Sequence, residues 1–318
     1  MKKVVIFGGG TGLSCILSGL KLFPIDVTTV IAVSDNGSST GKLKEELNIP
    51  AVGDVGKVLL SMANVDEDFV RLLSYRFEKG SLCNHPVRNI VLAALIDLKG
   101  NLTEATKYMC QLLDIKGTVL PLTGEKIDLI GESANREYFG EEEISQNIKN
   151  ISRLTYDHDI KIEQEIHAKI READLIIFSS GSLYTSIIPH LLAPEVRRAL
   201  EETKAPLLYV SNLVTQPGET DIHTVSQHVE VLNKYLGKRK INLVVANNGT
   251  VDENIKEHYL NLENKRIVQI DHEKLQQMEV QIIEDDIFCI ENEKIRHNAL
   301  KTAFLIFSYL MSEEAVSS

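Results

Sequence analysis

The sequence predicts an α/β fold, namely a doubly wound, mostly parallel Rossmann-like sheet with a helical insertion and a small β-rich inserted lobe. Continuous apolar runs alternate with helical patterns in both halves of the chain, and such runs are typical of strands buried on both faces. Polar, glycine-rich loops follow several of these runs, as they do at the carboxyl ends of parallel strands. The 318 residues can bury a large core, and we expect residues 1–318 to form a single domain.

The first 35 residues predict a βαβ unit. Residues 4–7 form a continuous apolar run, and a glycine-rich turn at 8–12 ends it. Apolar residues at 13, 16, 17 and 20 then recur at helical spacing, and residues 27–33 form a second, β-branched run. Strand, helix and strand within about 30 residues imply parallel pairing with a right-handed crossover.

Two segments in the first half interrupt this alternation. Residues 54–113 show helical patterns throughout and predict a helical insertion. Between residues 118 and 156, short apolar runs alternate with glycines and acidic residues, which predicts a small antiparallel β-rich lobe. These two additions account for the length of the chain beyond a simple doubly wound domain.

Strand and helix alternate again in the second half. We expect strands over residues 174–178, 206–210 and 241–246. One helix should open at Gly181–Ser182, another at about residue 224, and an amphipathic helix over residues 297–311 should close the chain.

Charge and cysteine usage exclude several classes of protein. The net charge of -11 argues against a nucleic-acid partner, which is bound through a basic surface, and we expect the cluster at 238–240 to be a solvated turn before a strand. The four cysteines match no zinc pattern, and Cys15 and Cys110 should be buried. We find no leader that predicts secretion and no run of about 18 apolar residues that predicts a membrane span. We therefore expect a cytoplasmic protein.

Four polar loops follow predicted strands, at residues 8–12, 34–41, 179–184 and 211–220, with Asn247 as a candidate fifth position. The carboxyl ends of parallel strands meet at one edge of a sheet, so these loops predict a shared site. The loop at 8–12 opens a helix, whose free N–H groups favour an anion. It lacks the dinucleotide fingerprint, because Leu13 stands where the last glycine would be.

The remaining loops carry weaker signals. Asp35 ends the second strand, where an acid often contacts a ribose, although an Asx-turn would also explain it. Gly41–Lys42 lacks the spacing of a phosphate-binding Walker motif, and Leu43 replaces its Ser or Thr. The loop at 179–184 is a second candidate anion nest without the pattern of a serine nucleophile.

The nine histidines predict no metal site or catalytic triad. Neither His190 nor His223 can be assigned as a base from the sequence. His223 and His228 are expected to be surface or capping residues. His85 lies in a polar turn at a helix start, and we expect it to line the cleft.

Taken together, these segments resemble the bacterial gluconeogenesis factor family, whose members bind uridine diphosphate (UDP) sugars and share a superfamily with 2-phospho-L-lactate transferase. The resemblance covers nearly the whole chain in order. The matching segments are 7–14, Pro50 with 53–55, 181–186 with Pro189, 215–216 with 218–221, and 296–299.

The chain departs from the family pattern in four of its motifs. Asn36 and Ser38 replace the second Asp and a Gly of the family, and Gly56–Lys57 replaces Arg-Asn. Residues 84–89 lack both glycines of the family's Gly-His-x-x-Gly-Asn, and Ser179–Ser180 replaces Gly-Pro. Asn36 removes a carboxylate that could bind Mg²⁺, and Ser38 should narrow the approach to the backbone.

The resemblance implies a cytoplasmic, nucleotide-sugar-binding regulatory protein, needed for normal cell shape and cell-wall synthesis on gluconeogenic carbon sources. The ligand would be a UDP-sugar such as UDP-N-acetylglucosamine or UDP-glucose. The resemblance does not decide whether the protein forms a homo-oligomer or binds a regulatory protein partner. It assigns no residue a catalytic role. The expected ligand-binding residues are Gly8, Gly9, Gly10, Thr11, Gly12, Asp35, Asn36, Ser38, Ser39, Asp54, His85, Asn89, Gly181, Ser182, Leu183, Tyr184, Asn212, Gln216 and Asn247.

Two enzymatic alternatives remain. A Mg²⁺-dependent, phospholactyl transferase-like enzyme would hold its metal on Asp35 and Asp54. An NAD-binding oxidoreductase would fit the first βαβ unit loosely. Against it, this chain lacks the glycine of the dinucleotide fingerprint at position 13 and has no evident proton donor.

Overall fold

The computed structural model describes residues 1–134, 136–147, 151–221, 223–291 and 293–312. Its centre is a sheet of seven strands, all parallel to their neighbours. In spatial order these are β10 (Gln281–Asp285), β9 (Leu243–Asn247), β8 (Leu207–Val210), β7 (Leu175–Phe178), β1 (Lys3–Gly8), β2 (Asp26–Ile31) and β3 (Thr118–Pro121). The chain adds strands to one side of β1 first and to the other side afterwards. The predicted doubly wound fold is thus confirmed, with its switch point between β1 and β7.

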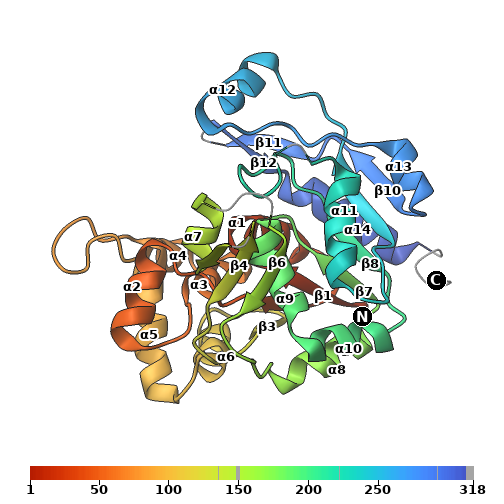
Figure 1. Ribbon diagram of the computed structural model, residues 1–318. Coiled ribbons are helices and arrows are strands. Elements are labelled where there is room, and N and C mark those ends of the chain that lie inside the picture. Colours follow the sequence, from red (N-terminus) through yellow and green to blue (C-terminus); the bar gives the residue numbers. More distant parts are fainter. Residues whose placement is uncertain (135, 148–150, 222, 292, 313–318) are drawn as a thin grey trace.

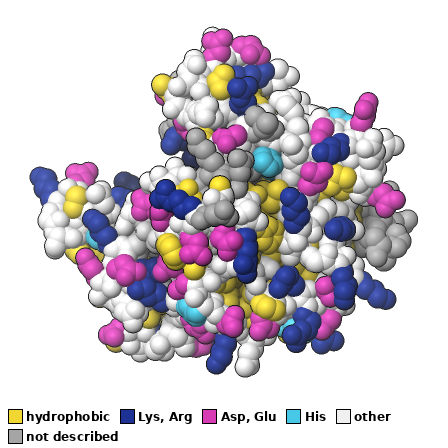
Figure 2. All heavy atoms as spheres, in the orientation of Figure 1, with side chains coloured by type: hydrophobic (Ala, Val, Ile, Leu, Met, Phe, Trp, Pro, Cys, Tyr) yellow, Lys and Arg dark blue, Asp and Glu magenta, His cyan; other side chains and the backbone are white. Residues whose placement is uncertain are grey.

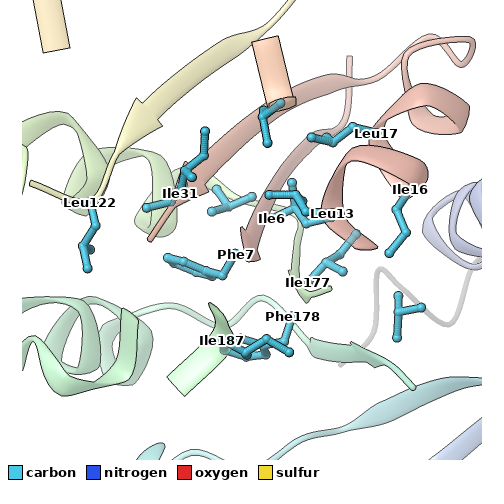
Figure 3. Packing of buried hydrophobic residues seen from close by; sticks show 14 of the residues in the cluster. Ile6, Phe7, Leu13, Ile16, Leu17, Ile31, Leu122, Ile177, Phe178 and Ile187 are labelled. Carbon is cyan, nitrogen blue, oxygen red and sulfur yellow. The ribbon is translucent and has the colours of Figure 1, made fainter. Parts of the chain in front are cut away.

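Helices cover both faces of this sheet (Figure 1). On one face α1 (Gly10–Leu20) packs against α3 (Gly53–Met62) and the closing helix α14 (Ala299–Met311). A second layer consists of α8 (Gln164–Glu172), α9 (Ile188–Leu192), α10 (Pro194–Glu202) and α11 (Val225–Tyr235). Between the layers, Phe7 of β1 stacks on Phe178 of β7 with ring centroids 5.6 Å apart (Figure 3). This packing fixes the two strands from which the switch-point loops emerge.

The helical segment connects β2 to β3. It contains α2 (Ser38–Leu47), α3, α4 (Glu67–Ser74), α5 (Val87–Lys99) and α6 (Leu102–Leu112), with an irregular loop over residues 75–86. Lys44 of α2 is fully buried, and its Nζ lies 2.6 Å from Asp128 and 2.7 Å from the carbonyl of Ile127. This contact fastens α2 to the segment that leads into the lobe.

The inserted lobe is smaller than the sequence predicts. Residues 118–121 are β3 of the central sheet and pair with β2, so the boundary at residue 118 is wrong. The run 118–121 is as short as those of the lobe, so the sequence pattern alone does not separate them. The lobe is a three-stranded antiparallel sheet of β4 (Leu129–Ser133), β5 (Arg136–Phe139) and β6 (Arg153–Tyr156), with α7 (Glu141–Asn147). Residues 135 and 148–150 of the predicted lobe lie outside the described part.

The C-terminal region also differs from the expectation. It adds α12 (Glu253–Glu263), α13 (His272–Gln277), strand β10 and a hairpin of β11 (Phe288–Glu291) and β12 (Lys294–His297). His297 ends β12 instead of opening the last helix, and Asn298 caps that helix by accepting from the N–H of Lys301. The hairpin matters for the site, because its second strand ends beside α1.

Two smaller expectations are also corrected. His228 is fully buried, with its Nδ1 3.3 Å from the hydroxyl of Tyr209, and burial lowers its pKa to about 3. Cys15 and Cys110 are half-buried, and the Cys15 thiol donates to the carbonyl of His297. In the described ranges no helix is both long and apolar enough to cross a membrane.

Candidate functional site

The candidate site lies at the carboxyl ends of β1 and β7, on either side of the switch point. The loop after β1 runs directly into α1, and the loop after β7 runs into a short π-helical turn, η1 (Leu183–Ile187). No side chain caps the N-terminus of α1. The first-turn N–H groups of that helix and its dipole therefore favour an anion at this point.

A cleft of about 340 Å³ opens between these loops, and we call it the glycine cleft. Gly9, Gly10, Thr11 and Gly12 form one wall, and residues 180–182, Asn212 and Gln216 form another. The β11–β12 hairpin adds Arg296 and His297, and Lys265 also faces the cleft. No Asp or Glu is among the described residues that line it. An anionic ligand would therefore meet backbone dipoles and two cations, of which Lys265 also pairs with Glu263, 2.6 Å away.

The absence of a side chain at Gly12 lets the two loops meet closely. A Cβ at this position would lie 2.2 Å from the carbonyl oxygen of Ser180. Gly8, at the end of β1, lies below the cleft against Ser179 and does not line it. The glycine motif is thus used partly for close packing of the two loops and partly for an open cleft wall.

Asn212 and Gln216 line the cleft, but their amides already have protein partners. Asn212 accepts from the N–H of Gly181 at 2.9 Å and donates to the carbonyl of Gly181 at 2.8 Å. Gln216 donates to the buried carboxyl of Glu219, which also accepts from the hydroxyl of Ser182. These two side chains therefore hold the loop at 180–182 in shape.

A second, acidic pocket of about 150 Å³ lies on the other side of Gly10. Asp35, Asp54 and Glu141 line it together with Lys57, whose Nζ lies 2.9 Å from Asp54 Oδ1. Burial raises the pKa of Asp35, and the charge of Asp54 adds to this effect. Burial, followed by the charges of Asp35, Asp54 and Glu219, raises the pKa of Glu141 to about 7.

The lobe supplies part of this acidic pocket. Glu141 begins α7, and its carboxyl accepts from the hydroxyl of Thr185 on η1 at 3.4 Å. Asn36 does not face the carboxylates, because its Oδ1 accepts from the N–H of Glu142 at 2.8 Å. Asn36 thus anchors the lobe, and the expected effect on Mg²⁺ of losing a carboxylate at this position stays a prediction.

Ser38, Ser39 and His85 line a third pocket, which we call the basic pocket, instead of the glycine cleft. Asn89 lies behind it and donates to Ser39 Oγ at 3.3 Å. Ser38 was expected to narrow the approach of a ligand to the backbone of the cleft. It lies instead at the wall of the basic pocket.

Three predicted ligand residues lie elsewhere. Leu183 and Tyr184 point into the hydrophobic core with exposed fractions of 0% and 7%. The Asn247 amide donates to the carbonyl of Gly249 and accepts from the N–H of Ile287. Asn247 lines a separate surface pocket. These three side chains are thus engaged in packing or in hydrogen bonds within the protein, and the expectation that Leu183, Tyr184 and Asn247 bind the ligand stays a prediction.

Sequence reasoning missed the contribution of Arg296 and His297. Residues 296–299 match a family motif, but the sequence does not show that the hairpin reaches the cleft. His297 Nε2 lies 3.0 Å from the carbonyl of Ser211, and burial lowers its pKa to about 4. His190, also fully buried, has both ring nitrogens on backbone carbonyls, and burial lowers its pKa to about 4. Both rings are therefore neutral structural groups.

Lys57 and Glu141 were missed as well. Lys57 follows Asp54 by one helical turn, so the spacing alone could have indicated an ion pair. Nothing in the sequence marks Glu141, because its position depends on how the lobe folds back.

Comparison with known proteins now identifies the family. The family model for 2-phospho-L-lactate transferase CofD matches residues 4–288. The chain belongs to the CofD family. Charged side chains of both signs are mixed over the face of the molecule that Figure 2 shows.

Named relatives extend over the same length. The chain is 38% identical to the gluconeogenesis factor of Bacillus subtilis (strain 168), over 97% of this chain and 98% of the relative. It is 38% identical to a putative gluconeogenesis factor of Thermotoga maritima, over 96% and 98%. A crystal structure of a UPF0052 family protein from Bacillus halodurans superposes with a TM-score of 0.93 at 34% identity, covering 98% of this chain and 100% of that one. The predicted resemblance to the gluconeogenesis factors is confirmed.

Proposed function

We propose that this CofD-family protein is a cytoplasmic gluconeogenesis factor that binds a UDP-sugar in the glycine cleft and regulates cell-wall synthesis and cell shape during gluconeogenic growth. The observation that carries the binding proposal is the cleft itself. It combines an uncapped helix N-terminus, two cations and no lining carboxylate among the described residues, in a chain of net charge -11. These features suit a diphosphate.

The cleft also suits the two ends of a nucleotide sugar. The first-turn N–H groups of α1 would bind the diphosphate, and Arg296 would add a bidentate donor. Leu213 and Val214 give part of the wall apolar surface on which a base or sugar ring could pack. The names of the relatives support the role of a gluconeogenesis factor.

The first experiment is a thermal-shift panel with UDP-N-acetylglucosamine, UDP-glucose, NAD and GDP, each with and without Mg²⁺. A ligand at 100 times its dissociation constant stabilises the folded state by about 2.7 kcal/mol. We expect a UDP-sugar to give the largest shift without Mg²⁺. If no UDP-sugar raises the melting temperature, the binding proposal is refuted.

A pair of variants then locates the ligand. Arg296→Ala should weaken UDP-sugar binding roughly tenfold or more by removing a charge-assisted contact. Lys294→Ala, an exposed cation on the same strand outside the cleft, is the matched control and should bind as the wild type does. For the regulatory role, Arg296→Ala should fail to restore cell shape to a deletion strain grown on a gluconeogenic carbon source, whereas Lys294→Ala should succeed.

A phospholactyl transferase-like enzyme is the second candidate, favoured by the family model and the acidic pocket. In the described part of the chain, no three His, Cys, Asp or Glu side chains are grouped to hold a metal. Mg²⁺ often uses only one or two carboxylates together with substrate phosphates, and Asp35 and Asp54 could supply them. A bound Mg²⁺ would offset phosphate charge, while Lys57 competes for Asp54. A Mg²⁺-dependent response to GDP would favour this candidate, and a response to NAD alone would favour an oxidoreductase.

A further inference from the structure

The basic pocket is a polar hollow that the proposed function does not use. It encloses about 500 Å³ between the N-terminus of α2 and the loop at 75–86, a volume within the range of small-molecule sites. No described lining residue is acidic, and the pocket shares none with the glycine cleft or the acidic pocket. Its lining residues are Ser38, Ser39, Lys42, Arg76, Cys83, Asn84 and His85.

Two cations line this pocket without a carboxylate partner. Arg76 donates to the carbonyl of Asn84, which holds its guanidinium at the pocket wall. Among the described residues neither Lys42 nor Arg76 forms an ion pair. Arg88 lies nearby, and its Nε is buried without a hydrogen-bond partner. Burial and the charge of Arg76 lower the pKa of Arg88. The charge of Asp54 offsets part of this effect. An oxyanion bound at Arg76 would relieve the remaining repulsion between the two guanidinium groups.

A buried pair of polar residues positions His85. Asn89 is 2% exposed and donates through Nδ2 to Ser39 Oγ, which lies 2.9 Å from His85 Nδ1. These two contacts hold the His85 ring at the pocket wall. An imidazole ring in this position can donate an N–H to a bound anion.

The N-terminus of α2 completes the set. Gly37 opens this ten-residue helix without a side-chain cap, and Ser38 and Ser39 of its first turn line the pocket. The helix dipole therefore adds to the two cations and the His85 donor. The two cations and the helix N-terminus thus favour a negatively charged group at this lining.

We propose that the basic pocket binds the oxyanion, a phosphate or a carboxylate, of a second small molecule at a site separate from the glycine cleft. Lys42 and Arg76 provide the charge, His85 provides an N–H, and the α2 N-terminus provides backbone donors. The site does not depend on a UDP-sugar binding in the cleft.

Calorimetric titration with inorganic phosphate, and separately with malonate, tests this site at ionic strength held constant with NaCl. Arg76→Gln and Lys42→Gln should each weaken the anion site roughly tenfold, the loss of one charge-assisted contact. Lys79→Gln, an exposed cation on the same loop outside the pocket, is the matched control and should leave it unchanged. Arg296→Ala should also leave it unchanged, because Arg296 lines only the glycine cleft.

The relative affinity for the two anions identifies the class of ligand. Tighter phosphate than malonate binding identifies a phosphorylated ligand, and the reverse identifies a carboxylate. If neither anion binds, if Arg76→Gln binds like the wild type, or if Arg296→Ala abolishes all anion binding, the proposal is overturned. Unfolding curves of the variants exclude loss of fold as the cause. Failure of the UDP-sugar panel would leave these results unaffected.

Discussion

Replacing Glu141 by Gln should stabilise the protein at alkaline pH and change little at acidic pH. Glu141 is half-buried at the start of α7 and faces the carboxyls of Asp35, Asp54 and Glu219. Burial and these like charges raise its pKa from 4.5 to about 7. The folded protein therefore holds this proton more tightly than the unfolded chain does.

The sign and size of the effect follow from proton linkage. Because the pKa is raised on folding, ionisation of Glu141 reduces the free energy of unfolding as the pH rises from 4.5 through 7. A tenfold change in proton affinity is about 1.4 kcal/mol, so the full difference corresponds to about 3 kcal/mol. Solvent screening of a half-buried carboxyl reduces this to about 2 kcal/mol. Gln carries no charge, so Glu141→Gln should recover that amount at pH 8 and almost none at pH 4.5.

Urea unfolding of the wild type and Glu141→Gln at half-unit steps between pH 4.5 and 8.5 measures this difference. Glu142→Gln is the matched control, because Glu142 is exposed on the same helix. Its difference from the wild type should stay within about 0.5 kcal/mol throughout. A difference for Glu141→Gln that is zero, or that does not depend on pH, would refute the reasoning that places this carboxyl against the others.

Three further predictions concern the surroundings of the site. Gly12→Ala should destabilise the fold by about 2 kcal/mol in urea unfolding, because its Cβ would lie 2.2 Å from the carbonyl oxygen of Ser180. Gly124→Ala, whose Cβ meets nothing closer than 3.5 Å, is its control and should be nearly neutral. Lys44→Met should cost about 2 kcal/mol by leaving Asp128 without its partner, measured in the same way. Lys57→Ala should raise the affinity for Mg²⁺ roughly tenfold in calorimetry, since it frees Asp54; an unchanged affinity would show that Mg²⁺ does not use this carboxyl.

The sequence was a good guide to the central sheet because its strands are buried on both faces. Residues 4–7 and 175–178 had to be continuously apolar, and they pair in β1 and β7 at the switch point. The edge strands were harder. The run at 118–121 pairs on one side only, and its length resembles that of the lobe strands. Strand β10 is partly exposed and mixes apolar with acidic residues, so its sequence lacks the continuous apolar run that marks a buried strand.

The site was predictable where the loops that form it directly follow strands. The glycine wall at 9–12 and the loop at 180–182 follow directly from strand ends, and both line the cleft. Arg296 and Glu141 come from elements that reach the site through tertiary packing, which local patterns do not encode. Asn247 follows a strand as the loop residues do, but β9 lies far enough from the switch point that its end meets a different pocket.

The distribution of charge around the loops explains how an acidic chain can offer a site for anions. Gly10 and Ser186 line both the glycine cleft and the acidic pocket, so the three carboxyls lie beside the cleft. A diphosphate bound there would be repelled by ionised Asp35, Asp54 and Glu141 unless protons or Lys57 offset their charge. The raised pKa of Glu141 near 7 means that proton uptake can contribute this compensation close to neutral pH. Anion binding in the cleft should therefore tighten as the pH falls from 8 to 6, and Glu141→Gln should remove most of that dependence.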